Sequence, residues 1–467
     1  MNDKVPLTRL FAEVATGSIP IELDETAIRT AERAFVDTMA VAYAAANEET
    51  VHRLESSLSS QMVNGMAATV TGRTASARTA ALVNGTAAHV LDYDDTADGM
   101  KGHPSAVLVP AILAVADEIS STGSAMLKAF CIGFQIDIAV GAGVDIKPHY
   151  QHGWHSTSSV GILGAAAAVA SLRHIDVQTT RNALGIAASM ASGSLQNFGT
   201  MTKSLHAGLT ASNAIIAVDL AMAGITADES QLEGEYGYFA MYGVNANLEL
   251  ARNVLLGGPS LSQRGLNIKR YPSCSTPHPA VDVLIGLSDS LDPNSIEAID
   301  ITLQPHGLDP LVSHRPTNGL QAKFSLEYVA AASLLDRHLS LASFTDAAVQ
   351  RPEVQDLLRR VHVDEAERPP VGPPEWDWIY TAMNIHTRSG EVRGVRRDLP
   401  RGHASIPLTD AELEQKVQEC LAYGGSPVGA DRLIERLWNL RQETAERDPL
   451  VPALDHSLKR IETTDEL

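Results

Sequence analysis

Apolar residues recur at helical spacing over the first half of the chain. From about Pro20 to Arg264 the sequence is rich in alanine and has few runs of β-branched residues, which is typical of α-helices. Small residues, as at 164–168, let helix backbones approach closely, so we expect helices buried in the middle of a bundle. The spacing predicts helices over 24–46, 106–119, 159–172, 179–191, 204–222 and 248–256, with Asp24 as a cap of the first.

The pattern changes after about Gly265, where β-rich segments alternate with shorter helices. We predict strands at 296–304, 358–363, 379–387 and 391–398, the last two joined as a hairpin through Gly390, and helices at 277–287, 325–335, 343–350, 409–421 and 429–447. The predicted fold is therefore mostly α. It has a large all-helical domain formed by residues 1–266 and 404–467, and a smaller α+β domain formed by residues 267–403.

The composition of the chain limits the kinds of binding partner and the compartment that we expect. Of the 467 residues, 36 are Lys or Arg and 56 are Asp or Glu, and the net charge of -20 disfavours nucleic acid and anionic membranes. The most apolar stretch, 160–172, is too short to span a bilayer, and the first residues lack the pattern of a signal peptide. Three widely spaced cysteines form no CxxC pair, which favours a reducing compartment. We therefore expect a cytoplasmic protein with no membrane partner.

Carboxylates and histidines gather between 89 and 105. Asp92, Asp94 and Asp95 lie close together, and His103 follows after a short loop. One interpretation is a metal site, although the donor spacing matches no known zinc or calcium loop, and another is a solvated acidic loop at a helix end. The third is that Asp92 or Asp95 orients His103 and adjusts its pKa, so that the imidazole acts as a general acid or base.

Two further clusters precede predicted helices. His155 is one of three histidines between 149 and 155 and lies where a helix would present its positive end, unless the group is an accidental surface feature. Lys203 follows a glycine-containing loop, and with the exposed amides of the helix start it is either a cradle for a carboxylate or a solvated lysine.

The remaining clusters lie in the second half of the chain. Lys269, Arg270, Tyr271 and Cys274 precede the predicted helix that contains His278. They are either a surface cation pair with a buried thiol, or a group in which neighbouring cations lower the pKa of the Cys274 thiol. The segment from Arg315 to Lys323 offers two more cations, either solvated or poised to hold a carboxylate.

The clusters share one feature: although the chain as a whole is acidic, they place His, Lys and Arg side chains at the starts of several helices. A pocket for a small di- or tricarboxylate needs such a local reversal of charge. Proton removal next to a carboxylate needs it too, since fixed positive charge must stabilise the transition state.

At these clusters the sequence resembles the MmgE/PrpD family, which includes 2-methylcitrate dehydratase, cis-aconitate decarboxylase and iminodisuccinate epimerase. The resemblance covers nearly the whole chain. It implies a large helical domain with a smaller α+β domain, a homodimer, no organic cofactor, and a substrate bound between the domains. Its motifs are Asp92-Tyr93-Asp94-Asp95-Thr96 with Gly102-His103-Pro104-Ser105, Gly153-Trp154-His155-Ser156-Thr157-Ser158, Gly199-Thr200-Met201-Thr202-Lys203, Lys269-Arg270-Tyr271-Pro272-Ser273-Cys274 and Ala322-Lys323-Phe324-Ser325. From the donor spacing we expect no metal.

The resemblance also implies a pocket, and two departures mark this chain. Decarboxylase-type members look as if they carry a histidine where this chain has Cys274, and a tyrosine expected shortly before the Arg-Pro pair is absent from 311–313. The segments around His155 and Cys274 look closer to the epimerase-like branch. The implied pocket residues are Asp92, Thr96, His103, His155, Lys203 and Lys269.

The resulting hypothesis is a cofactor-independent enzyme that removes a proton α to a carboxylate, followed by elimination or by reprotonation. His103, oriented by Asp92, or His155 would be the base, and Cys274 would be a second acid or base in an epimerase. Thr96, Lys203, Lys269, Arg270 and Tyr271 would bind the substrate. The alternatives are an epimerase of an iminodisuccinate-like dicarboxylate and a non-catalytic carboxylate-binding protein.

Overall fold

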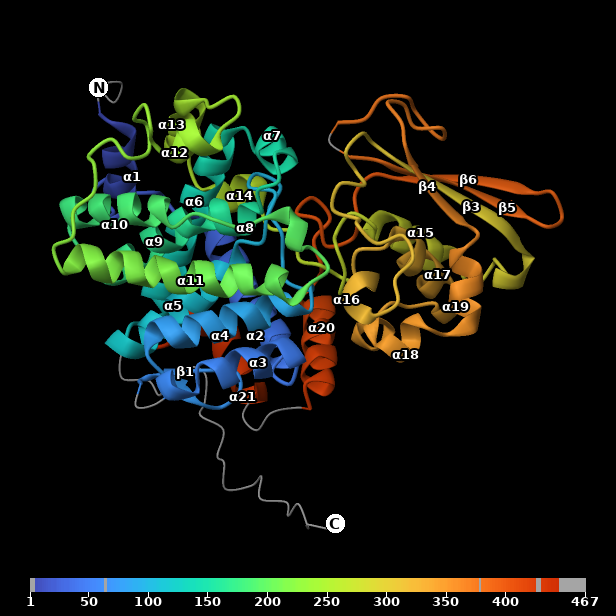
Figure 1. Cartoon of the computed structure of the whole chain (residues 1–467), viewed down its shortest axis with the longest axis horizontal. Coiled ribbons are helices and arrows are strands. Elements are labelled where there is room, and N and C mark those ends of the chain that lie inside the picture. The colour runs from blue at the N-terminus through green and yellow to red at the C-terminus, as the bar shows by residue number, and fades with distance from the viewer. Residues whose placement is uncertain (1–4, 63–64, 378, 426–429, 445–467) are drawn as a thin grey trace, which may run out of the picture.

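The computed structural model describes residues 5–62, 65–377, 379–425 and 430–444. Figure 1 shows two lobes side by side, one built from helices and the other containing a four-stranded sheet with helices packed against it. The predicted fold class, a large helical domain with a smaller α+β domain, is confirmed.

The helical lobe is formed by segments from both parts of the chain. A short antiparallel pair, β1 (Ala67–Ala68) and β2 (Thr74–Ala75), and the 3₁₀ turns Ser59–Gln61, Leu195–Asn197 and Leu440–Gln442 complete it. Its helices are α1 (Leu7–Ala15), α2 (Glu25–Ala44), α3 (Glu49–Ser57), α4 (Ala77–Val90), α5 (Ser105–Ile119), α6 (Gly123–Val144), α7 (Ile146–Gln151), α8 (Ser156–Ser159), α9 (Gly161–Leu172), α10 (Val177–Ser189), α11 (Met201–Met222), α12 (Tyr238–Tyr242), α13 (Leu248–Leu256), α14 (Ser260–Arg264), α20 (Asp410–Tyr423) and α21 (Ala430–Trp438).

Close packing of α4 against α11 places functional side chains together. A Cβ on Gly208 of α11 would lie 2.2 Å from the Leu82 carbonyl oxygen of α4, so only glycine permits this approach. The two helices run antiparallel, and the end of α4, with His89, therefore lies beside the first turn of α11, with Lys203. Asp24 accepts a hydrogen bond from the Ala27 amide at the start of α2, as predicted.

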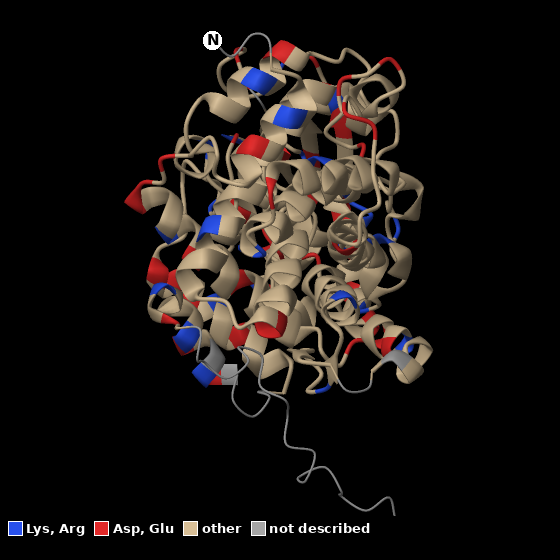
Figure 2. Cartoon of the chain, turned by 90° about the vertical axis from the view of Figure 1, so that its left-hand side faces the viewer, with Lys and Arg blue, Asp and Glu red and all other residues tan. Residues whose placement is uncertain are grey.

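Charged residues are scattered over the outer ribbons of the helical lobe, and its central helices are almost free of them (Figure 2). Two helices among the described residues, α6 and α11, are long and apolar enough to cross a membrane by length and composition alone, which the sequence prediction based on 160–172 did not foresee. In α6, 89% of the apolar window is buried inside the protein, and in α11 the share is 61%. Packing within the lobe accounts for the apolar character of α6.

The α+β lobe contains a mixed sheet with strand order β4-β3-β5-β6. Strand β3 (Ile296–Leu303) pairs in parallel with β4 (Val361–Glu365) and antiparallel with β5 (Thr381–Thr387), which pairs antiparallel with β6 (Val392–Arg397). The predicted hairpin is confirmed, and Gly390 adopts a φ of 88° in its turn. The remaining elements are α15 (His278–Leu287), α16 (Gly319–Ala322), α17 (Leu326–Asp336), α18 (Asp346–Val349), α19 (Pro352–Leu358) and the 3₁₀ turns Pro293–Ser295 and Leu341–Phe344.

Three predicted elements differ from the structure. The helix predicted at 343–350 is divided into a 3₁₀ turn and the short α18, because Thr345 leaves the helical conformation to cap α18. Leu358 ends α19 instead of starting a strand, and β4 begins at Val361. The last predicted helix ends at Trp438, and its residues 429 and 445–447 lie outside the described residues.

The segment after residue 403 returns to the helical lobe. Leu413, Val417 and Leu437 belong to the same apolar core as α2 and α6, whereas residues from Tyr271 to Ile385 form a second core. In α20, the Lys416 ammonium lies 2.6 Å from Asp37 of α2, and both side chains are buried. The chain thus crosses between the lobes near residues 267–271 and 400–408, while the exact domain boundaries stay a prediction.

Candidate active site

A cavity of about 320 Å³ is lined by residues from both lobes. All the predicted site residues except Arg270 and Tyr271 line it. The helical lobe contributes Asp92, Thr96, His103, His155 and Lys203, and the segment that leads into α15 contributes Lys269 and Cys274.

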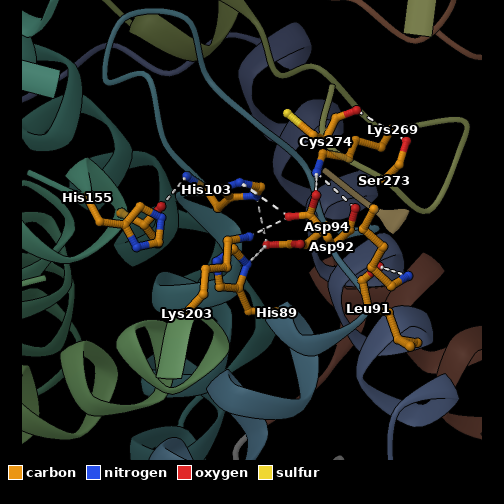
Figure 3. A network of polar contacts seen from close by, with 12 residues as sticks. His89, Leu91, Asp92, Asp94, His103, His155, Lys203, Lys269, Ser273 and Cys274 are labelled. Atoms are coloured by element: carbon orange, nitrogen blue, oxygen red, sulfur yellow. Dashed lines mark hydrogen bonds and ion pairs between the residues drawn. The ribbon is translucent and has the colours of Figure 1, made fainter. Parts of the chain in front are cut away.

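Asp92 binds two lysines in the cavity wall (Figure 3). Lys203 Nζ lies 2.5 Å from Asp92 Oδ1, and Lys269 Nζ lies 3.2 Å from Asp92 Oδ2. Burial alone would raise the pKa of Asp92, but the two ammonium groups outweigh burial and hold this pKa well below its usual range. One carboxylate between two cations leaves a net positive charge at this place in the cavity.

His103 contacts a different carboxylate from the one predicted. Its Nδ1 lies 3.0 Å from Asp94 Oδ2, whereas its Nε2 lies 3.9 Å from Asp92 Oδ1. The prediction that Asp92 orients His103 is thus corrected, because Asp92 is held by the lysines and Asp94 is the nearer partner. Asp95, the other carboxylate considered, accepts hydrogen bonds from the amide and hydroxyl of Ser105 at the start of α5.

The contact with Asp94 defines how His103 can act. Burial lowers the pKa of His103, although Asp94 opposes this effect, so the imidazole is neutral at neutral pH. The pair does not meet hydrogen-bond geometry, but the nearby charge of Asp94 favours the proton on Nδ1, so the proton is assigned to that nitrogen and Nε2 is left as an acceptor. The same Asp94 oxygen lies 2.7 Å from Nδ1 of the buried His89, whose pKa burial lowers to about 3. His103 therefore has the form of a general base held by a carboxylate.

His155 lies immediately before α8 and is also buried. Its Nδ1 is 2.9 Å from Nδ1 of His206, and its Nε2 has no hydrogen-bond partner among the described residues. Burial holds the pKa of His155 well below its usual range, with nearby His and Lys side chains adding to the effect. A second neutral imidazole is thus available at the cavity.

Cys274 faces the cavity in the thiol form. Its Sγ lies 3.7 Å from Thr276 Oγ1, and its amide donates to the Lys323 carbonyl. Burial, followed by the charge of Asp92, raises the pKa of the Cys274 thiol, and Lys269 offsets this only in part. The interpretation as a low-pKa thiolate is therefore wrong, and Cys274 can donate a proton.

Arg270 and Tyr271 are not among the described residues that line the cavity, which corrects their predicted role. Arg270 lies 3.4 Å from Glu412 of α20, and the Tyr271 hydroxyl donates to Asp282 of α15. Tyr271 packs its ring in the core of the α+β lobe.

Three buried lysines hold the loop that follows α4. Lys323, Lys269 and Lys416 donate to the consecutive carbonyl oxygens of residues 91, 92 and 93, at 2.7, 2.9 and 2.8 Å. Asp92 has a φ of 52°, a conformation that is costly for a residue with a side chain. All three lysines come from beyond residue 266, so the later part of the chain fixes the loop that carries Asp92 and Asp94.

Sequence reasoning gave too little weight to three groups. Asp94 and His278 stand inside the quoted clusters without an assigned role, and Lys101 stands between Asp98 and His103 with no signal beyond its charge. His278 lines the cavity, its Nε2 lacks a partner among the described residues, and burial lowers its pKa to about 3. Thr96, by contrast, lies where it was predicted and pairs through its backbone with Asn267.

The donor atoms of His89, Asp92, Asp94 and His103 lie within 4.8 Å of one another, close enough to surround a metal ion. The charges around them do not fit one, because Lys203 and Lys269 already occupy the two oxygens of Asp92. A further cation there would face strong repulsion. We therefore assign no metal to this cluster.

The comparisons with known proteins agree with this fold. The family models of the MmgE/PrpD N-terminal and C-terminal domains match residues 9–251 and 271–440. The chain belongs to the MmgE/PrpD family. It is 28% identical over 422 residues to the cis-aconitate decarboxylase of Homo sapiens, with 88% of this chain and 86% of the relative covered. The Mus musculus enzyme of that name is 29% identical with the same coverage, and the Aspergillus terreus one is 24% identical over 62% of this chain and 64% of the relative.

Proposed function

We propose that this protein is a cofactor-independent lyase that removes a proton α to a carboxylate of a small di- or tricarboxylate, with elimination of a leaving group. Its relatives are named for a reaction of cis-aconitate, a tricarboxylate, which supports the substrate class. The observation that carries the proposal is the neutral His103, held by Asp94, beside the Lys203–Asp92–Lys269 group.

The proposed reaction begins at Nε2 of His103. This nitrogen takes the α-proton, and Asp94 stabilises the imidazolium that forms. Lys203 and Lys269 hold the neighbouring carboxylate and stabilise the charge that develops on it. The electron pair of the broken C–H bond forms the C=C bond, and the leaving group departs with a proton from a cavity acid.

A second candidate is an epimerase of an iminodisuccinate-like dicarboxylate. The protonated Cys274 favours it, because an epimerase returns a proton to the opposite face of the carbon and needs an acid there. A non-catalytic carboxylate-binding protein has less support, since binding alone does not require a neutral histidine held by a carboxylate beside the cations.

Proton NMR in deuterated buffer tests these functions. The enzyme is mixed separately with citrate, 2-methylcitrate, cis-aconitate, malate, aspartate and iminodisuccinate. The signals of the protons on the carbon atoms next to each carboxylate are followed over time. New vinyl signals, or loss of the existing vinyl signal of cis-aconitate by hydration, support the lyase, and exchange without a new product supports the epimerase. A chain that binds an acid but neither exchanges nor converts any of them would contradict both.

The Cys274→Ser variant separates the two reactions further. A serine hydroxyl is a much weaker acid than a thiol, so the variant of an epimerase loses turnover while wash-out of the α-proton continues at His103. If Cys274→Ser keeps full turnover on the substrate found, Cys274 is not the second acid.

Two further expectations accompany the proposal. The protein is expected to form a homodimer and to be cytoplasmic. Light scattering coupled to size-exclusion chromatography gives the mass in solution, and a single-chain mass at micromolar concentration would contradict the dimer.

A further inference from the structure

The cavity contains a second cationic position apart from the Lys203–Asp92–Lys269 group. Lys101 lines it, and in the described part of the chain no carboxylate oxygen lies within 4.0 Å of the Lys101 ammonium. The Nζ atom lies 4.2 Å from the centroid of the Tyr150 ring. A half-buried ammonium that rests only on an aromatic ring has unused hydrogen-bond donors, which a ligand can take up.

The backbone around Lys101 is fixed. The Lys101 amide donates to the Asp98 carbonyl, and the Ser156 hydroxyl donates to the Lys101 carbonyl. Lys101 has a φ of 45°, and a Cβ on the next residue, Gly102, would lie only 2.8 Å from the Thr157 amide. The turn therefore packs closely against α8. Its left-handed backbone conformation at Lys101 is energetically unfavourable, and the surrounding contacts stabilise it.

Two carboxylates near Lys101 have contacts of their own. Asp98 accepts from Asn267 and lies 3.1 Å from His403, and Asp309 lies 3.4 Å from His306. The charged and titratable neighbours of Lys101 are Asp309, Lys147 and Cys274. Lys101 therefore lies on the Cys274 side of the cavity, and its own ammonium is the charge there that an anion would meet.

We propose that Lys101 is a specificity-determining residue that binds a second carboxylate of the substrate, the one remote from the reacting carbon. This inference rests on the proposed function. The Lys203–Asp92–Lys269 group holds the carboxylate beside the proton that is removed, and Lys101 holds the distal carboxylate. The substrate class is then an acid with at least two carboxylates, and a monocarboxylate leaves Lys101 without a partner.

The test compares substrates and variants in the full chain. Lys101→Met and Lys101→Arg are assayed with the acid that the parent enzyme converts, and with the analogue whose distal carboxylate is a neutral amide. Loss of a charge-assisted contact raises KM for the acid about 10- to 100-fold in Lys101→Met, with kcat within about threefold, and leaves KM for the amide unchanged. Lys101→Arg keeps most of the preference for the acid. Lys128→Met, at an exposed position of α6, is the matched control.

Two outcomes would overturn the inference. An equal loss for acid and amide means that Lys101 supports the fold only, and an unchanged KM for the acid means that it does not contact the substrate. If the parent converts no acid, the proposed function fails separately, and calorimetric titration with propane-1,2,3-tricarboxylate decides the inference. Weaker binding to Lys101→Met by 10-fold or more supports it, and equal or absent binding contradicts it.

Discussion

The two walls of the cavity are built differently. In the wall from the helical lobe, His89, Asp92, Asp94 and His103 contact one another or a lysine, so each charged group has a nearby partner. In the wall from the α+β lobe, the one side-chain hydrogen bond of the Cys274 thiol among the described residues is with the Thr276 hydroxyl, and the Nε2 of His278 has no hydrogen-bond partner there. The first wall is therefore organised by a network of charged contacts before a ligand arrives, and the second has fewer such contacts. Atoms that a ligand can satisfy lie in both walls, among them Nε2 of His155 and Nε2 of His278.

The largest expected effect comes from removing the base in the helical wall. His103→Gln should lower the rate of α-proton exchange about 10²- to 10⁴-fold, because the other imidazole that contacts Asp94, His89, is not among the described residues that line the cavity. The NMR exchange assay measures it, with His52→Gln on the exposed side of α3 as the control. A rate within threefold of the parent would remove His103 from the mechanism and leave His155 as the candidate.

The next effect tests how the helical wall is held. Lys416→Met leaves Asp37 buried without its cation and removes the donor to the Tyr93 carbonyl. The free energy of unfolding should fall by about 3–5 kcal/mol, as for a buried ion pair that loses one partner. Urea denaturation measures it, and Lys128→Met should change it by less than about 0.5 kcal/mol. A loss below about 1 kcal/mol for Lys416→Met would show that α20 does not support this wall.

A smaller effect concerns His278 in the α+β wall and depends on pH. Its folded-state pKa of about 3 lies below the ordinary value of 6.5, so between these values the unfolded chain binds a proton that the folded chain does not. Stability from this residue is therefore present above pH 6.5 and is lost as the pH falls, by about 1.4 kcal/mol for each pH unit.

The variant His278→Gln lacks this titration. Urea denaturation at pH 7.5, 5.5 and 4.5 should show a shallower loss of stability for the variant than for the parent. The comparison between the two chains cancels the titration of buried groups that they share, such as Asp95, whose pKa burial raises to about 8. Parallel curves would mean that His278 is protonated in the folded protein.

The smallest expected effect is that of replacing Arg270, which we compare with the replacement of its neighbour Lys269 where the two cavity walls meet. Arg270→Met breaks a partly exposed contact with Glu412, so we expect a loss of stability below about 1 kcal/mol and a KM within twofold of the parent. Lysine 269 faces the cavity, and its replacement by Met should raise KM at least tenfold. Steady-state kinetics measures both, and a tenfold rise in KM for Arg270→Met would return Arg270 to the substrate site.

Much of the fold follows from local patterns. Helical periodicity predicts α2, α5, α10 and α13, and the alternation around Gly390 predicts the β5–β6 hairpin, because these elements depend on residues a few positions apart. The five polar clusters likewise predict most of the cavity lining, since enzymes place reactive groups at helix starts and in loops.

The pairing of side chains was decided by tertiary structure. Asp92, Asp94 and Asp95 are close together in the sequence, but the packing of α4, α5 and α11 gives each a different partner. Asp92 contacts the lysines, Asp94 contacts the histidines, and Asp95 accepts a hydrogen bond from Ser105. The three lysines at the carbonyls of residues 91–93 lie between 177 and 323 positions from their partners. Local propensity acts over one helical turn or one strand pair, whereas these contacts exist only after helices and loops from distant parts of the chain have packed together. For Lys323, the packing of the two lobes is needed as well, so local patterns do not encode these contacts.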